Sequence, residues 1–498
     1  MYGYLKRLLT TGAAYQVAEA VAKVIALLLL PVYTRYLSDA DYGTADLLLT
    51  LVILVSIVAR LGIIEAFLRY YFVDDDPARR DRIARAATGI VLLTTTVLAA
   101  VSAALADPLS RLVLGRSDAT LWYITTLGLW TFTNLEMAYA LLRVDELTRL
   151  YVRASLTNVA ITVALSVYLV VVREDGARGL LLGNFVASTV VLLGLWWRLR
   201  HRIRIGIHHR LELTPMLRFG LPTVPAEISV FALNLIDRIY LYRTQSPGEA
   251  GLYSLAVKLA AVVIFATRAF QYAWPPLAYS IEDDEEAGRV YAMVTTYYVL
   301  LTGLIVAGLT LLGRWAIRLL ATPEFYGSFP ALPWVALGWA MYGLFLVFVV
   351  IAGRAKVTTR NFPAAAAGLA ANVALLLVLV DPLGIAGAGI ALCGAYVVML
   401  GLMYLFTRSL FTVGFQWLRL VQLVAVIGGL TVAGEVLLPT EGLWPFLART
   451  AVLAAIPLVL VATRFFRPEE VARGRQLLAR LRRTAADDTL AVGPRTEV

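Results

Sequence analysis

Long apolar segments recur along the whole chain, separated by short polar stretches. Each is about 20 residues long, the length that an α-helix needs to cross a hydrocarbon core of about 30 Å. These segments lack the polar and apolar alternation of barrel strands, so the pattern predicts an all-α membrane protein with about 14 transmembrane helices. The predicted spans lie near 12–31, 43–65, 84–106, 120–141, 151–172, 178–198, 219–241, 250–273, 290–312, 331–352, 362–380, 385–407, 417–438 and 443–463.

Composition and charge support this class of protein. The chain is 60% hydrophobic and 16% charged, whereas soluble domains are about 45–50% apolar and 25% charged. The net charge of +10 indicates basic cytoplasmic loops rather than a nucleic-acid partner. Because most Lys and Arg fall in loops on the side of the N-terminus, we expect a multi-pass protein of the inner (cytoplasmic) membrane with both termini in the cytoplasm.

The residues that usually carry chemistry or bind metals are scarce. Cys393 is the only cysteine, so neither a disulfide nor a thiolate metal site is available. His201, His208 and His209 are the only histidines, and all three fall in one basic loop. No Gly-rich phosphate motif or defensible carboxylate pair accompanies them. We therefore expect a protein that is not an enzyme and that needs no metal or other cofactor.

The two halves of the chain resemble each other. A shift of 208 residues, which carries Gly12 onto Gly220, also matches Glu19 to Glu227, Gly43 to Gly251 and Arg60 to Arg268. Each half has an even number of predicted helices, so the repeat is parallel and its two lobes should enclose a cavity. The predicted divisions are an N-lobe of six helices (1–200), a cytoplasmic basic linker (201–218), a C-lobe of six helices (219–410), a C-terminal helix pair (411–465) and a cytoplasmic amphipathic, charged tail (466–498).

Two local patterns in the repeat have a structural interpretation. Ser38 and Ser246 occupy matching positions before an acid three residues later, which predicts helix caps at the starts of the second and eighth helices. Pro222 and Pro225 interrupt the seventh helix near its inner end, which predicts a bend there.

Charged residues inside the predicted spans are candidates for function. A charge at the bilayer centre costs about 2.5–3.5 kcal/mol on insertion scales, so each needs a partner or a cavity. The basic ones are Lys23, Arg60, Lys258, Arg268 and Arg449. Among the acids, Glu19, Glu136 and Glu227 lie deepest, while Asp46, Glu65, Asp237 and Glu435 lie close enough to span ends to be hydrated and are set aside.

The basic residues suggest an anion site. Arg60 and Arg268 occupy equivalent positions, one in each lobe, and a guanidinium presents a planar set of donors that fits phosphate oxygens. We therefore expect Arg60 and Arg268, with Lys23 and Lys258, to bind a diphosphate. Glu19 and Glu227 are the candidate coupling or ion-pair residues.

Three further residues and the C-terminal tail have two interpretations each. Tyr15, Gln16 and Asn234 lie on the first helix of each lobe, where they either line a polar cavity or pack helix against helix. Glu19 and Lys23, four residues apart, alternatively form an internal ion pair. The tail after Phe466 is expected to be an amphipathic helix on the membrane surface or a docking site for a biosynthetic partner.

Several motifs resemble the polysaccharide and lipid-linked oligosaccharide exporters of the multidrug/oligosaccharidyl-lipid/polysaccharide flippase superfamily. The resemblance implies a two-lobed, alternating-access carrier for undecaprenyl-diphosphate-linked sugar units in cell-envelope polysaccharide biosynthesis, coupled to an ion or to protons. The motifs are residues 30–38 (LPVYTRYLS), 41–43 (DYG), 237–238 (DR), 246–258 (SPGEAGLYSLAVK) and 384–388 (GIAGA).

Two rival functions stay open at this point. A multidrug or cation antiporter of the same superfamily would need an acidic cavity, and a membrane sugar polymerase or ligase would need a general base or metal and a sizeable outer domain. The expected partners are the lipid-linked sugar and membrane lipids, with a polysaccharide polymerase or glycosyltransferases as candidate protein partners and no nucleic acid.

Overall fold

The computed structural model describes Val21, residues 24–73, 76–200, 210–355, 357–468 and Glu470. These residues form α-helices joined by short loops, and no strand occurs among them. The helices are α2 (Leu30–Tyr36), α3 (Asp39–Arg60), α4 (Ile63–Tyr70), α5 (Pro77–Ala104), α6 (Ala106–Leu114), α7 (Ala119–Val144), α8 (Thr148–Val167), α9 (Gly176–Arg198), α10 (Arg210–Gly220), α11 (Val224–Thr244), α12 (Pro247–Ser280), α13 (Asp284–Leu320), α14 (Leu332–Arg354), α15 (Asn361–Thr407), α16 (Trp417–Leu423), α17 (Gly429–Leu437) and α18 (Leu443–Ala462).

The helices confirm the prediction of an all-α membrane protein. Eleven helices within the described part of the chain are long and apolar enough to cross a membrane. One of them, α15, is a hairpin: it folds back at Gly384, so that Gly394 lies beside Leu375 and Gly368 lies beside Met399. The 26-residue α7 is not among the eleven, and most of the predicted span 12–31 lies outside the described residues. The number 14 therefore stays a prediction.

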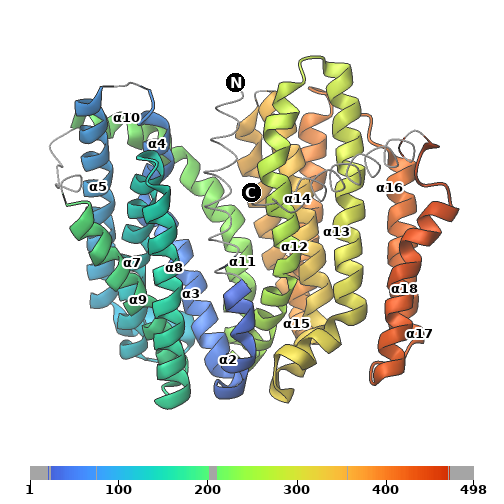
Figure 1. The fold of residues 1–498 in the computed structure, drawn as a ribbon, viewed down its shortest axis with the longest axis horizontal. Helices are drawn as coiled ribbons and strands as arrows, with labels where there is room; N and C mark the ends of the chain where they lie inside the picture. Colours follow the sequence, from blue (N-terminus) through green and yellow to red (C-terminus); the bar gives the residue numbers. More distant parts are fainter. Residues whose placement is uncertain are drawn as a thin grey trace, which may run out of the picture.

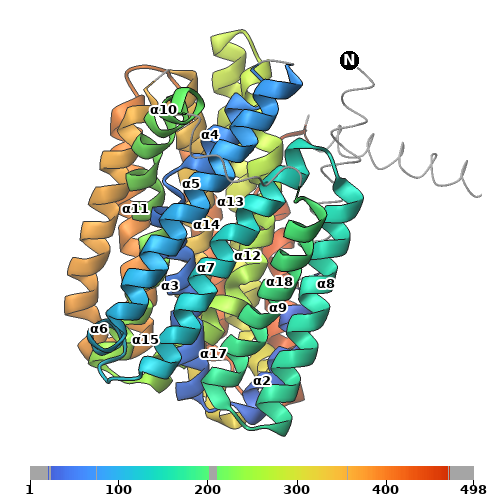
Figure 2. The same cartoon turned by 90° about the vertical axis from the view of Figure 1, so that its left-hand side faces the viewer.

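Two groups of helices meet along α3. Figure 1 shows α3 to α9 on one side and α11 to α15 on the other, with α16 to α18 beyond α13. The view in Figure 2 shows α3 running along the bundle with α5 and α7. Helix α3 packs against α5, α7 and α9 of its own group and also against α11 and α12. Because α3 belongs to both interfaces, its side chains join the two groups.

The two ends of the bundle are distinguished by their loops. We call the end with the turns before α3 and α12 the Ser38 end, and the other end, with the loops before α5 and α13, the opposite end (Figure 1). The predicted helix caps are confirmed at the Ser38 end. The Ser38 hydroxyl accepts a hydrogen bond from the Asp41 amide at 3.0 Å, and the Ser246 hydroxyl accepts one from the Glu249 amide at 3.0 Å.

Residues 210–218, which were assigned to the linker, belong to helix α10. Met216 is fully buried on α4 and α5, where Ile63 and Phe67 form the same apolar cluster. A 3-10 turn over Leu221–Thr223 then separates α10 from α11, at the place where the prolines predicted a bend. The remaining linker residues, 201–209, lie outside the described part.

The two groups approach each other closely between α3 and α12, at a matched pair of the repeat. A Cβ atom on Gly43 would lie 2.3 Å from the carbonyl oxygen of Pro247, and a Cβ atom on Gly251 would lie 2.0 Å from that of Asp39. Only glycine leaves room for two backbones at this separation. The equivalent glycines of the two halves thus form one contact near the Ser38 end.

The close contact of Gly43 with Gly251 leads to a prediction about stability. In Gly251→Ala, the added methyl group must push α3 away from α12, and we expect a loss of about 1–3 kcal/mol because backbone atoms cannot yield as a side chain can. Thermal unfolding in detergent measures it. The matched control is Gly401→Ala on α15, where nothing lies within 4 Å and the better helix propensity of alanine should leave stability equal or higher. Equal melting temperatures for the two variants would contradict the tight contact.

The C-terminal helices are fixed to α13 by a buried ionic cluster. Arg449 of α18 is fully buried and pairs with Glu435 of α17, which also pairs with Arg314 of α13. The Arg449 guanidinium also donates a hydrogen bond of 2.8 Å to the carbonyl oxygen of Leu438, just after α17. Two arginines thus pair with the Glu435 carboxylate, whose side chain is 24% exposed.

Candidate functional site

The larger of two cavities that flank α3 lies between this helix and the second group of helices. It has a volume of about 730 Å³ and is bounded by α3, α11, α12, α14 and α15. This volume lies in the range of about 300–1,000 Å³ that is typical of small-molecule sites. Its polar and aromatic lining includes Glu227, Asn234, Arg238, Arg268, Trp339 and Tyr342.

Three of the predicted site residues line this cavity together. Glu227 and Asn234 come from α11, two turns apart, and Arg268 comes from α12. Arg268 lies well inside the long helix α12, which continues to Ser280. Two guanidinium groups, those of Arg268 and Arg238, therefore lie in one cavity wall with a single carboxylate. The roles of these residues in binding stay predictions.

Arg60 lies at a helix end, unlike its repeat equivalent. It is the last residue of α3, which ends at a left-handed turn through Leu61 and Gly62. Its guanidinium forms an ion pair with Glu227 of α11 and lies 4.0 Å from Glu65. Arg60 does not line the cavity itself, but Glu227, which does, connects it to the cavity wall. The two acids are thus the neighbours of this arginine.

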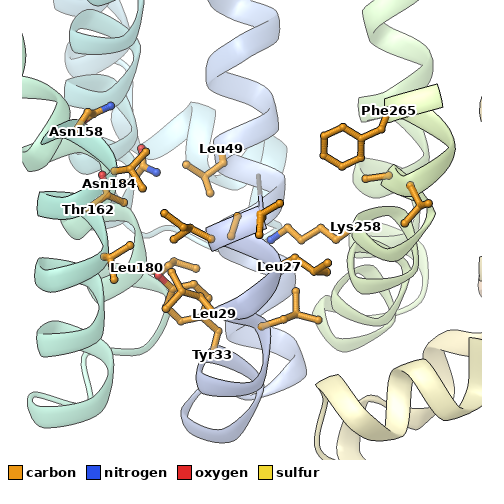
Figure 3. Close-up of a pocket in the computed structure, with 18 residues that line it drawn as sticks. Leu27, Leu29, Tyr33, Leu49, Asn158, Thr162, Leu180, Asn184, Lys258 and Phe265 are labelled. Carbon is orange, nitrogen blue, oxygen red and sulfur yellow. The ribbon is translucent and has the colours of Figure 1, made fainter. Parts of the chain in front are cut away.

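A second cavity lies on the other face of α3 (Figure 3). It has a volume of about 470 Å³ and is bounded by residues 24–30 and by α2, α3, α8, α9 and α12. The wall is mostly apolar, with Asn158 and Thr162 of α8, Asn184 of α9 and Lys258 of α12 among its polar residues. A few polar groups in an apolar wall are typical of a site that orients an amphipathic ligand.

A buried carboxylate lies between the two cavities. Asp46 of α3 accepts a hydrogen bond of 2.9 Å from Nε of Arg238, and its other oxygen lies 3.4 Å from Nζ of Lys258. Lys258 also lies 4.3 Å from the centroid of the Tyr42 ring, a cation–π distance. Asp46 was set aside as hydrated, and this was wrong: the residue is only 7% exposed.

Asp237 was set aside for the same reason and is also buried. It is 1% exposed, and its carboxylate accepts a hydrogen bond of 2.8 Å from the Tyr253 hydroxyl. Its neighbour Arg238 is 6% exposed and was noted only as part of a motif. The signal in the sequence was this adjacent acid and base within an apolar helix, which in a membrane points to buried pairing.

Four predicted site residues cannot be placed. Lys23, Glu19, Tyr15 and Gln16 lie outside the described residues.

These observations define a class of protein: a multi-pass helical membrane protein in which two cavities flank one helix and charged side chains are held inside the bundle. The chain belongs to the polysaccharide biosynthesis protein family, whose model matches residues 32–330. A curated relative, the "Lsg locus putative protein 1" of Haemophilus influenzae, is 25% identical over 271 residues. That match covers 53% of this chain and 64% of the relative, so the chain spans slightly less than two thirds of it.

The fold is shared with solved transporters. The lipid II flippase MurJ in an inward closed conformation has a TM-score of 0.72 at 13% identity, over 90% of this chain and 98% of that one. An inward-facing multidrug resistance transporter of the MATE family has a TM-score of 0.63 at 14% identity, over 78% of this chain and 94% of that one. Identities this low show a common fold.

Proposed function

We propose that the protein flips an undecaprenyl-diphosphate-linked oligosaccharide, the repeat unit of a polysaccharide, across the cytoplasmic membrane by alternating access. The observation that carries the proposal is the 730 Å³ cavity with Arg268 and Arg238 in its wall against one carboxylate, Glu227. Basic side chains in an interior cavity suit a diphosphate, and amide and aromatic side chains such as Asn234 and Trp339 suit sugar rings. Membership in the polysaccharide biosynthesis protein family supports the same cargo class.

The proposed roles follow the repeat. Arg268 of α12 binds the diphosphate in the larger cavity, and Lys258 of α12, which lines the smaller cavity, and Arg60 of α3 join it when Asp46 and Glu227 release them. Lys23 and Glu19 stay the predicted basic and acidic members of this set, and Tyr15 and Gln16 stay predicted polar residues of the cargo site. Exchange of Arg60 between Glu227 and the cargo would couple binding to movement of α3 against α11, with an ion or a proton as the energy source.

We also propose which end of the bundle loads the cargo. The opposite end carries the basic loops near Arg69 and Arg198, so we assign it to the cytoplasm together with both termini. The biosynthetic enzymes that build and polymerise the sugar are the expected partners on the two sides of the membrane.

A multidrug antiporter is the alternative that the shared fold raises. Cationic drugs need net negative charge at the site, whereas the described wall of the larger cavity carries two arginines and one glutamate, and the Asp46 carboxylate that pairs with Arg238 is shared with Lys258. Attraction of an anion is therefore favoured over attraction of a cation.

Transport by the purified protein tests the proposal. In vesicles of defined lipid, a fluorescent undecaprenyl-diphosphate oligosaccharide should cross the bilayer much faster than in protein-free vesicles, as read from its accessibility to an impermeant quencher. A cationic dye in the same vesicles should gain no transport from an imposed proton or sodium gradient. Gradient-driven movement of the dye without movement of the lipid would establish the antiporter instead.

A further inference from the structure

The Asp46 carboxylate pairs with two basic side chains of the other helix group. Arg238 of α11 contacts one of its oxygens at 2.9 Å and Lys258 of α12 the other at 3.4 Å. Arg238 also donates to the backbone carbonyl of Asn234 and lies 3.4 Å from the Ser254 hydroxyl. Arg238 is therefore held within its own helix group, whereas Lys258 contacts Asp46 and Tyr42, both of α3. Asp46 is the carboxylate that α3 presents to both cations.

The two cations face different cavities. Arg238 lines the larger cavity and Lys258 the smaller one, where Figure 3 shows its side chain extending toward α3 from α12. The Lys258 side chain is 37% exposed, whereas that of Asp46 is 10% exposed. An anion in either cavity thus reaches one of the two cations, and Asp46 occupies the position between them.

We infer that Asp46 occupies the place of a cargo phosphate and that the diphosphate displaces it, so that Arg238 and Lys258 form an anion site which opens only when α3 moves. This inference rests on the proposed function for the identity of the anion. A diphosphate has more oxygens and more charge than one carboxylate, and Arg and Lys bind phosphate by charge-assisted hydrogen bonds. It can therefore compete for both cations at once.

Displacement of Asp46 would loosen the contact of α3 with α11 and α12. A ligand shifts a conformational equilibrium only through its different affinities for the two states. The affinities for the diphosphate differ here because Asp46 pairs with both cations when α3 is packed against α11 and α12, whereas the cations can bind the diphosphate when α3 has moved away. Cargo binding would then promote separation of the two groups near the Ser38 end, where Gly43 and Gly251 touch.

Binding of a short prenyl diphosphate to the purified full-length protein tests this exchange. Farnesyl diphosphate, titrated by calorimetry in detergent, should bind Asp46→Asn at least about tenfold more tightly than the unaltered protein, because the competing charge is gone; tenfold is about 1.4 kcal/mol. The control Asp46→Glu keeps the competitor and should bind as the unaltered protein does. Lys258→Met should bind at least about tenfold more weakly.

A distance readout reports the movement of α3. A Cβ atom on Gly248 would lie 2.6 Å from the Asp39 carboxylate, so Asp39→Cys with Gly248→Cys, in a Cys393→Ala background, places two thiols across the interface. Added farnesyl diphosphate should lower the yield of their disulfide severalfold. Inorganic pyrophosphate in place of farnesyl diphosphate shows whether the phosphates suffice without the prenyl chain.

Three results would overturn the inference. The first is a folded Asp46→Asn protein with unchanged or weaker binding, and the second is a disulfide yield that farnesyl diphosphate leaves unchanged. If Asp46→Asn does not fold, unaltered affinity in Lys258→Met overturns it. The flipping assay on the unaltered protein distinguishes failure of this inference from failure of the proposed function. If the protein flips the lipid but the affinity and disulfide effects are missing, only the exchange at Asp46 is rejected. If the protein neither flips the lipid nor binds a prenyl diphosphate, the proposed cargo is rejected as well.

Discussion

Arg60→Glu combined with Arg268→Glu is expected to lower flipping of a labelled undecaprenyl-diphosphate oligosaccharide in vesicles at least about a hundredfold. Each hydrogen bond to a charged group contributes about 1.5–3 kcal/mol. The loss of two such contacts, together with two added charge repulsions, is therefore expected to lower the flipping rate by more than this hundredfold. The variant also places a second acid beside Glu227, which pairs with Arg60 in the unaltered protein. The initial rate of quencher-accessible signal measures the effect.

The matched control reverses two arginines outside the cavities. Arg153 of α8 and Arg173, near the end of that helix, are both exposed, so Arg153→Glu with Arg173→Glu changes the net charge equally without altering the cavity. This control should flip the lipid at nearly the unaltered rate. Equal rates in both double variants would remove Arg60 and Arg268 from the diphosphate site.

Glu435→Ala is expected to destabilise the C-terminal helices by about 3–5 kcal/mol. Removal of this carboxylate leaves Arg449 without its ion-pair partner, although the arginine is fully buried, and a buried charge that loses its partner costs about that much. Arg314 loses the same partner. Limited proteolysis of the segment from α16 to α18, together with thermal unfolding in detergent, should show the loss.

Another glutamate in the same region is the control. Glu441 pairs with Arg318 at 2.7 Å, but its side chain is 77% exposed. Glu441→Ala should therefore change stability by less than about 1 kcal/mol, as for other exposed pairs. A similar loss in both variants would mean that burial of Arg449 does not determine the stability of this helix pair.

Much of the fold could be predicted from the sequence because a membrane imposes strict local rules. The span predicted at 443–463 corresponds to α18, Leu443–Ala462, and that predicted at 178–198 corresponds to α9, Gly176–Arg198. The Ser38 and Ser246 caps were equally local, since each depends on a short stretch of chain. By contrast, the left-handed turn at Leu61 and Gly62 divides the predicted span 43–65 into α3 and α4, and the apolar pattern did not reveal it.

The candidate site was less predictable because its pairings join distant helices. The repeat matches Arg60 with Arg268 as sequence positions, but α3 ends at Arg60 whereas α12 continues past Arg268, so their surroundings differ. Distance from a span end likewise failed as a guide to hydration. Asp46 lies only two turns from the start of α3, but α11 and α12 cover it. Only the packing of the helices determines such burial.

We propose that the diphosphate-linked sugar occupies the cavity bounded by α3, α11, α12, α14 and α15. A photoreactive undecaprenyl-diphosphate sugar can be bound to the purified protein and cross-linked, and the labelled peptides mapped by mass spectrometry. The sugar-borne label should attach to the cavity wall, at Trp339 and Tyr342 and on the α12 segment around Arg268. Labels confined to the lipid-facing outer surface, with none in that wall, would contradict it.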